Sequence, residues 1–120
     1  MDLPKNEKTF NFEAVGDLTG KKYEGTFTVK CVLTIGDRRR LELEKSRQLG
    51  DMKNPTQDLI AIAIMSSNLL IRVIDGPDWW KQLLGEDLID QEILPALYSK
   101  VLDQEDAWRK ELKEKASQGN

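Results

Sequence analysis

Residues 8–33, KTFNFEAVGDLTGKKYEGTFTVKCVL, decide the fold class of this 120-residue chain. Polar and apolar residues alternate on both sides of the turn sequence Gly-Asp-Leu-Thr-Gly at 16–20, and a period of two is typical of half-buried strands. The first strand is expected over 8–15, and the second carries the alternation on to Leu33, with Cys31 facing the core. These residues predict an antiparallel β-hairpin.

The segment after the hairpin predicts a helix over 35–49. Thr34 followed three residues later by Asp37 matches a helix start, and Gly50 suits the position just after a helix end. The apolar residues of this helix do not form one stripe at a 3.6-residue period. The sequence therefore does not indicate clearly which face of this helix is buried.

A second helix should form the centre of the fold. Asn54 is expected to cap it, with Pro55 at the first helical position, and it should run to about Ile74. Apolar residues surround nearly its whole circumference, which predicts neighbours on most sides. The charge-free stretch 59–71 has thirteen residues, whereas a helix needs about 20 to cross a bilayer, so we expect no membrane span.

Two more helices follow along the chain. The Gly-Pro pair at 76–77 should break the central helix and begin a short one that carries Trp79 and Trp80 and ends at Gly85. Apolar residues at three- and four-residue spacings then predict an amphipathic helix over 90–115.

The expected fold class is α+β, in one domain over 1–120. An N-terminal antiparallel hairpin (8–33) packs on a mainly helical bundle (35–115) of three longer helices and one short one, and the ends 1–7 and 116–120 are expected to be flexible. Because a two-stranded hairpin is marginal alone, it must pack on the helices or pair with another copy, which predicts self-association.

Composition excludes several classes of function. The formal net charge of -3 offers no cationic field to nucleic acid or anionic lipid. The chain has no histidine, the commonest general base and metal ligand, so we expect no catalytic residue, cofactor or metal. Cys31 is the single cysteine, and the first residues lack the pattern of a secretory signal, so a cytoplasmic location is expected.

Two segments imitate ligand sites. Residues 16–22 (GDLTGKK) look like a phosphate-binding loop, but three residues separate the two glycines, whereas such a loop needs four. Two strands also flank the segment, which favours a hairpin turn. Four carboxylates also lie within seven residues: Glu86, Asp87, Asp90 and Glu92. Their spacing fits no calcium loop, and carboxylates are favourable near helix starts, so capping is favoured over a metal site.

The aromatic residues are the strongest candidates for a binding surface. Trp79 and Trp80 are adjacent on a short helix and point about 100° apart, so either both wedge between helices or one faces a partner. The protein-binding surface is therefore expected around Trp79, Trp80, Leu83, Leu84, Tyr98 and Trp108.

The order of these features resembles the tail assembly chaperones of long-tailed (siphovirus-like) bacteriophages and prophages. The resemblance is carried by YEGTFTVK at 23–30, RQLG at 47–50, GPDWW at 76–80, and the pattern from Asp90 through Leu97, Tyr98, Lys100, Val101 and Glu105 to Trp108. It implies a protein that binds the tape-measure protein, keeps it soluble and helps recruit tail-tube subunits. It also implies action in the cytoplasm of the bacterial host cell and absence from the mature virion.

Two other interpretations stay open. One is another small phage morphogenesis or virion protein, such as a head–tail connector or tail-completion factor. The other is a small nucleic-acid-binding regulator that uses Arg38, Arg39, Arg40 and Arg47. Neighbouring acidic residues favour a solvated or ion-paired helix face for these arginines.

Overall fold

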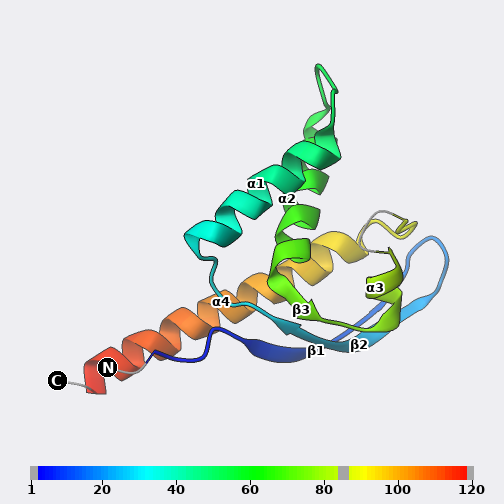
Figure 1. The fold of residues 1–120 in the computed structure, drawn as a ribbon. Helices are drawn as coiled ribbons and strands as arrows, with labels where there is room; N and C mark the ends of the chain where they lie inside the picture. The colour runs from blue at the N-terminus through cyan, green and yellow to red at the C-terminus, as the bar shows by residue number, and fades with distance from the viewer. Residues whose placement is uncertain (1–2, 84–86, 119–120) are drawn as a thin grey trace.

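A three-stranded antiparallel sheet and four helices make up the computed structural model, which describes residues 3–83 and 87–118 (Figure 1). The elements are β1 (Lys8–Val15), β2 (Lys22–Val29), α1 (Ile35–Leu49), α2 (Gln57–Arg72), β3 (Val73–Asp75), α3 (Asp78–Leu83) and α4 (Ile93–Gln118). The sheet order is β1-β2-β3. The predicted α+β fold with an N-terminal hairpin, three longer helices and one short one is confirmed.

The predicted antiparallel hairpin forms, but its second strand is shorter than expected. β1 pairs with β2 from Lys8 opposite Val29 to Val15 opposite Lys22. The prediction that the second strand reaches Leu33 is wrong, because the chain beyond β2 bonds to other groups. The Asn6 side chain accepts hydrogen bonds from the backbone N–H groups of Cys31 (3.0 Å) and the following residue (2.8 Å). Cys31 is nevertheless buried, as expected.

The central helix is shorter at both ends than predicted. Its N-cap is Thr56, whose hydroxyl accepts from the Leu59 N–H (3.2 Å), and not Asn54. At its other end the chain leaves the helix after Arg72, and β3 pairs with β2. Non-local pairing with β2 thus overrides the helical continuation to Ile74. The hairpin consequently has a third strand, so the expectation of two strands is wrong and β1 is one edge of the sheet.

α1 has the predicted bounds. Thr34 and Asp37 form a reciprocal capping box, and the Gly50 N–H closes the helix on Ser46 O (2.9 Å). Asp37 also accepts a hydrogen bond from Lys30 Nζ (2.8 Å) and one from Arg40. Led by the Lys30 contact, these bonds hold the pKa of Asp37 well below its usual range, although burial opposes the shift.

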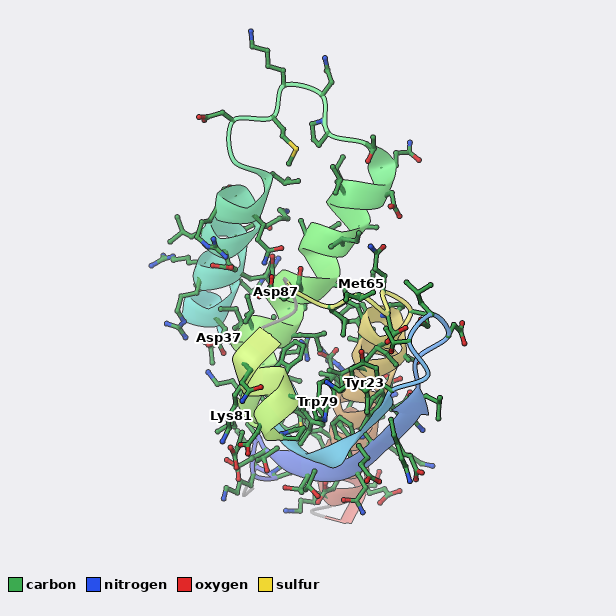
Figure 2. All side chains as sticks on the ribbon, turned by 90° about the vertical axis from the view of Figure 1, so that its right-hand side faces the viewer. Tyr23, Asp37, Met65, Trp79, Lys81 and Asp87 are labelled. Atoms are coloured by element: carbon green, nitrogen blue, oxygen red, sulfur yellow. The ribbon has the colours of Figure 1, made fainter. Side chains whose placement is uncertain are left out.

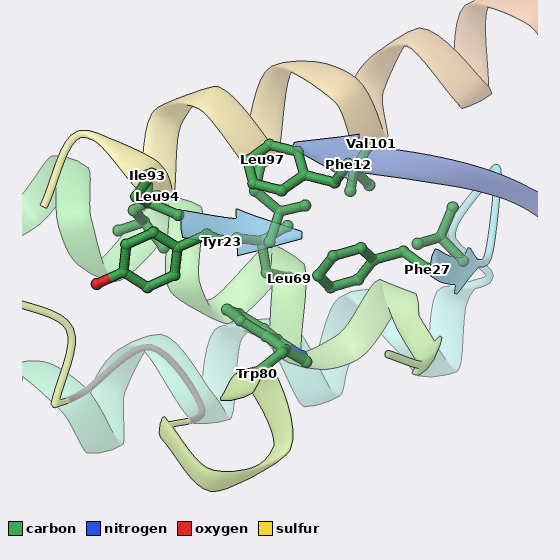
Figure 3. Packing of buried hydrophobic residues seen from close by; sticks show 10 residues of the cluster. Phe12, Tyr23, Phe27, Leu69, Trp80, Ile93, Leu94, Leu97 and Val101 are labelled. Carbon is green, nitrogen blue, oxygen red and sulfur yellow. The ribbon is translucent and has the colours of Figure 1, made fainter. Parts of the chain in front are cut away.

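The core lies between one face of the sheet and the helices α2, α3 and α4 (Figure 3). Its buried members are Phe12, Tyr23, Phe27, Val29, Leu69, Trp80, Ile93, Leu94, Leu97 and Val101. α4 begins at Ile93, slightly later than the predicted Asp90, and continues past Lys115 to Gln118.

A buried arginine joins three parts of the chain. Arg72 donates to the Cys31 carbonyl (2.8 Å) and to Glu105 on α4 (2.9 Å). Burial acts to raise the pKa of Glu105, but hydrogen bonds from Arg72 and Arg109 outweigh it and lower that pKa. The end of α2 is thereby attached to both the segment after β2 and α4.

The N-terminal segment is attached to the folded body, although 1–7 was expected to be flexible. The Trp108 indole donates to the Pro4 carbonyl (3.2 Å), and Asn6 hydrogen-bonds beyond β2. Pro4 and Asn6 therefore attach this segment to the folded chain, whereas Leu3 and Lys5 are exposed. At the other end of the chain, the segment 116–120 that was expected to be flexible is helical as far as Gln118.

α1 and the first half of α2 project from the rest of the molecule as an arm (Figure 1). The radius of gyration is 16.0 Å, compared with about 14 Å for a compact domain of this length. Asp37 is the one buried residue of α1. Leu59 and Ile64 are 42% and 40% exposed, so neighbours do not cover α2 on most sides, contrary to the prediction.

Candidate functional site: the groove between α2 and α4

A groove of about 370 Å³ separates α2 from the start of α4. We call it the α2–α4 groove, and its lining residues are Asp58, Ile62, Met65, Leu88, Gln91, Glu92, Leu94 and Pro95. Its floor is apolar and its rim is polar. Figure 2 labels Met65 where α2 faces the first turns of α4.

Helical spacing brings the α2 wall together. Asp58, Ile62 and Met65 are four and three residues apart, so they share one face of α2. On the other wall, Leu94 and Pro95 belong to the first turn of α4, where proline needs no intrahelical N–H bond. Ile62 and Met65 are half-buried, so the groove presents partly accessible apolar surface.

Asp90 holds the α4 wall in place. Its buried carboxylate accepts hydrogen bonds from the backbone N–H groups of Leu18 (2.9 Å) and Thr19 (3.0 Å) and from the Tyr23 hydroxyl (2.8 Å). A Cβ at Gly16 would lie 2.1 Å from an Asp90 oxygen, so the turn needs glycine there. The hairpin turn and the start of α4 are therefore fixed to each other.

The same contacts explain the ionisation of Asp90. Hydrogen bonds, led by that from the Thr19 hydroxyl, lower the pKa of Asp90 to about 2, although burial opposes the shift. The prediction that this carboxylate caps a helix start is wrong, because its side chain binds the hairpin turn instead.

The other carboxylates of the 86–92 segment have different surroundings. Glu92 accepts from the Asp17 N–H (3.2 Å) at the groove rim, Asp87 is exposed, and Glu86 lies outside the described residues. Across residues 3–83 and 87–118, no group of three or more histidine, cysteine, aspartate or glutamate side chains is arranged to hold a metal ion.

Both tryptophans of α3 pack against the sheet. Trp80 is 4% exposed, and its ring centroid lies 6.2 Å from that of Phe27. Trp79 is half-buried; its centroid lies 5.2 Å from that of Tyr23, and its indole donates to the Glu24 carbonyl (2.9 Å) (Figure 2). Both side chains thus contact the sheet and are not wedged between helices alone, and a partner-facing role for the half-buried Trp79 stays a prediction.

The remaining sequence-predicted binding residues do not complete one surface. Trp108 is 8% exposed and lies at the Lys8 end of β1, where Lys8 Nζ contacts Glu111 (3.1 Å), whereas Trp79 lies at the opposite end of the hairpin. Leu84 lies outside the described residues. For Leu83, the last residue of α3, the structure describes the backbone. Tyr98 is half-buried, one turn beyond Leu94 on α4, and so continues the groove side of that helix.

The arginines of α1 differ in their pairing. Arg40 contacts Asp37, and Arg47 contacts Glu44 (2.7 Å). Arg38 and Arg39 are exposed. Two of the four arginines, Arg40 and Arg47, are thus paired with carboxylates on the same helix.

The groove could not be predicted from the sequence because its residues come from α2, from the turn before α4 and from the first turn of α4, and their proximity depends on tertiary packing. A signal did exist: Ile62 and Met65 belong to a helix too apolar to be covered by one neighbour.

No protein-family model, curated protein or solved structure matches this chain. Within the described part of the chain, every helix is too short or too polar to span a membrane.

Proposed function

We propose that this protein is a phage tail assembly chaperone. It binds the tape-measure protein in the cytoplasm of the bacterial host cell, keeps it soluble, helps recruit tail-tube subunits, and is absent from the mature virion. It acts by binding and not as an enzyme. The resemblance noted in the sequence supports the family, and the α2–α4 groove is the single observation that supports the mode of action.

The groove suits a chaperone for a helical client. Its apolar floor is built by Ile62, Met65 and Leu94, and its rim is polar. A long helical protein exposes apolar stripes before assembly, and burial of such a stripe in a groove between helices excludes water from both surfaces. Covering the stripe would prevent the client from associating with itself.

Co-expression with the tape-measure protein of the same phage or prophage tests the proposal. We expect the chain to move most of that protein into the soluble fraction. Met65→Glu should abolish this effect because it places a charge on the groove floor, whereas Met52→Glu, at a 45% exposed position between α1 and α2, should retain it. Equal activity of both variants, each shown to be folded by circular dichroism, would remove the groove from the mechanism.

Purified particles distinguish the chaperone from a head–tail connector or tail-completion factor. We expect mass spectrometry to find the chain in infected-cell lysates and not in virions. Stoichiometric incorporation into virions would contradict the chaperone function.

A further inference from the structure

The chemistry of the client segment can be inferred from the charges around the α2–α4 groove. The lining contains two carboxylates, Asp58 and Glu92, and no lysine or arginine among its described residues. Gln91 is an exposed lining residue, and Asp87, one residue before the lining residue Leu88, is another exposed carboxylate. The groove therefore combines an apolar floor with an acidic rim.

We propose that the groove receives an amphipathic helix of the tape-measure protein whose apolar stripe is flanked by lysine or arginine. This inference rests on the proposed function and specifies which part of the client the protein recognises. Apolar side chains at three- and four-residue spacings enter between Met65 and Leu94, and the flanking cations lie beside Asp58 and Glu92.

A helix fits this site better than an extended segment. One wall is the helix α2, and the other is the turn that carries Leu88, Gln91 and Glu92 together with the first turn of α4. None of the lining residues belongs to a strand, so the groove offers no strand-edge N–H or C=O groups. An extended peptide on such a surface would leave its own backbone groups unpaired, whereas a helix satisfies them internally. The volume of about 370 Å³ lies near the lower end of ligand-site sizes, roughly 300–1,000 Å³, which suits a few anchoring side chains.

The two carboxylates are placed to select the flanking charge. The Asp17 N–H holds Glu92 at the rim (3.2 Å), and Asp58 is exposed in the first turn of α2. Exposed ion pairs each contribute little affinity, so the apolar anchors provide most of the binding and the charges provide selectivity.

Three labelled synthetic helices test the inference by fluorescence anisotropy. They share one leucine stripe at i, i+3, i+4 and i+7 and carry lysine, glutamine or glutamate beside it. We expect affinity to fall in the order lysine, glutamine, glutamate, by about threefold per charge. Added salt should weaken binding of the lysine peptide and leave the glutamine peptide nearly unchanged.

Exposed substitutions make the test independent of folding. Gln91→Lys should lower the affinity for the lysine peptide and Gln91→Glu should raise it, each by about threefold. Asp58→Asn should weaken it, whereas Asp106→Asn makes the same change in net charge on an exposed part of α4, eleven residues after Pro95, and should have no effect.

The outcomes separate the two proposals. If the tape-measure protein binds but the three peptides show no charge order, or the glutamate peptide binds best, the inferred chemistry is wrong and the chaperone function stands. If the lysine peptide binds in the expected order but the tape-measure protein does not bind, the proposed client is wrong.

Discussion

Asp90 links the hairpin turn to the start of α4, and its ionisation makes this link depend on pH. The folded chain lowers the pKa of Asp90 from 3.8 to about 2, so folding favours the ionised carboxyl. The resulting stabilisation is complete above pH 4 and is lost as pH falls toward 2. We expect Asp90→Asn to lower the urea midpoint at pH 7 and the difference from the parent to shrink by pH 2.5. A difference that does not change with pH would contradict this assignment.

Gly16 provides a second test of the same link. A Cβ there would meet the Asp90 carboxylate at 2.1 Å. We therefore expect Gly16→Ala to lower the free energy of unfolding by about 1–3 kcal/mol through overpacking. Gly36→Ala is the matched control: its nearest neighbour would lie at 3.6 Å, and alanine favours the helix by up to about 1 kcal/mol. If Gly36→Ala lost stability and Gly16→Ala did not, the explanation that Gly16 is needed beside Asp90 would be wrong.

At the scale of the elements, α1 differs from α4 in how it is held. Asp37 is the one buried residue of α1, whereas α4 contributes Leu97 and Val101 to the core. Elements with few buried apolar contacts open locally before the whole molecule unfolds. We expect the amides of α1 to exchange hydrogen sooner than those of α4.

The Thr34 cap allows this difference to be tested. Thr34→Ala removes the hydroxyl that accepts from the Asp37 N–H (3.1 Å) and should reduce protection of α1 by about 1 kcal/mol. Hydrogen exchange with mass spectrometry should show little change in α4. Equal loss of protection in both helices would mean that they open together.

Local signals explain which elements could be predicted. β1 and α1 have their predicted bounds, because alternation and a capping box act within each segment. β3 could not be predicted, because Val73 becomes a strand residue by pairing with Val29, 44 positions earlier. The early end of β2 likewise depends on Asn6, which no local pattern indicates.

At the scale of the whole molecule, the site could not be predicted because it, too, depends on contacts between distant parts of the chain. The sequence indicated a set of aromatic residues as the binding surface, but Trp80 and Trp108 are buried at separate places in the fold. Of the four whose side chains the structure describes, Trp79, Trp80, Tyr98 and Trp108, Tyr98 is the one next to the groove side of α4. A groove between two helices depends on their packing, so periodicity along either helix could indicate its apolar face but not its partner.

Self-association stays a prediction, but the strand expected to pair with another copy is now β1. β3 covers one side of β2, so β1, with eight residues, is the longer edge of the sheet. Edge strands can pair with another copy. We expect sedimentation velocity to show a concentration-dependent dimer, and a strictly monomeric species at high concentration would argue against pairing through β1.

The central claim is that the α2–α4 groove binds the tape-measure protein. Nuclear magnetic resonance spectra of the isotope-labelled chain, recorded with and without a soluble fragment of that protein, test it most directly. We predict that the largest shift changes occur at Ile62, Met65, Leu88 and Leu94, with small changes at Trp79 and along β1. Changes concentrated at Trp79 or β1, with the groove residues unaffected, would contradict the claim.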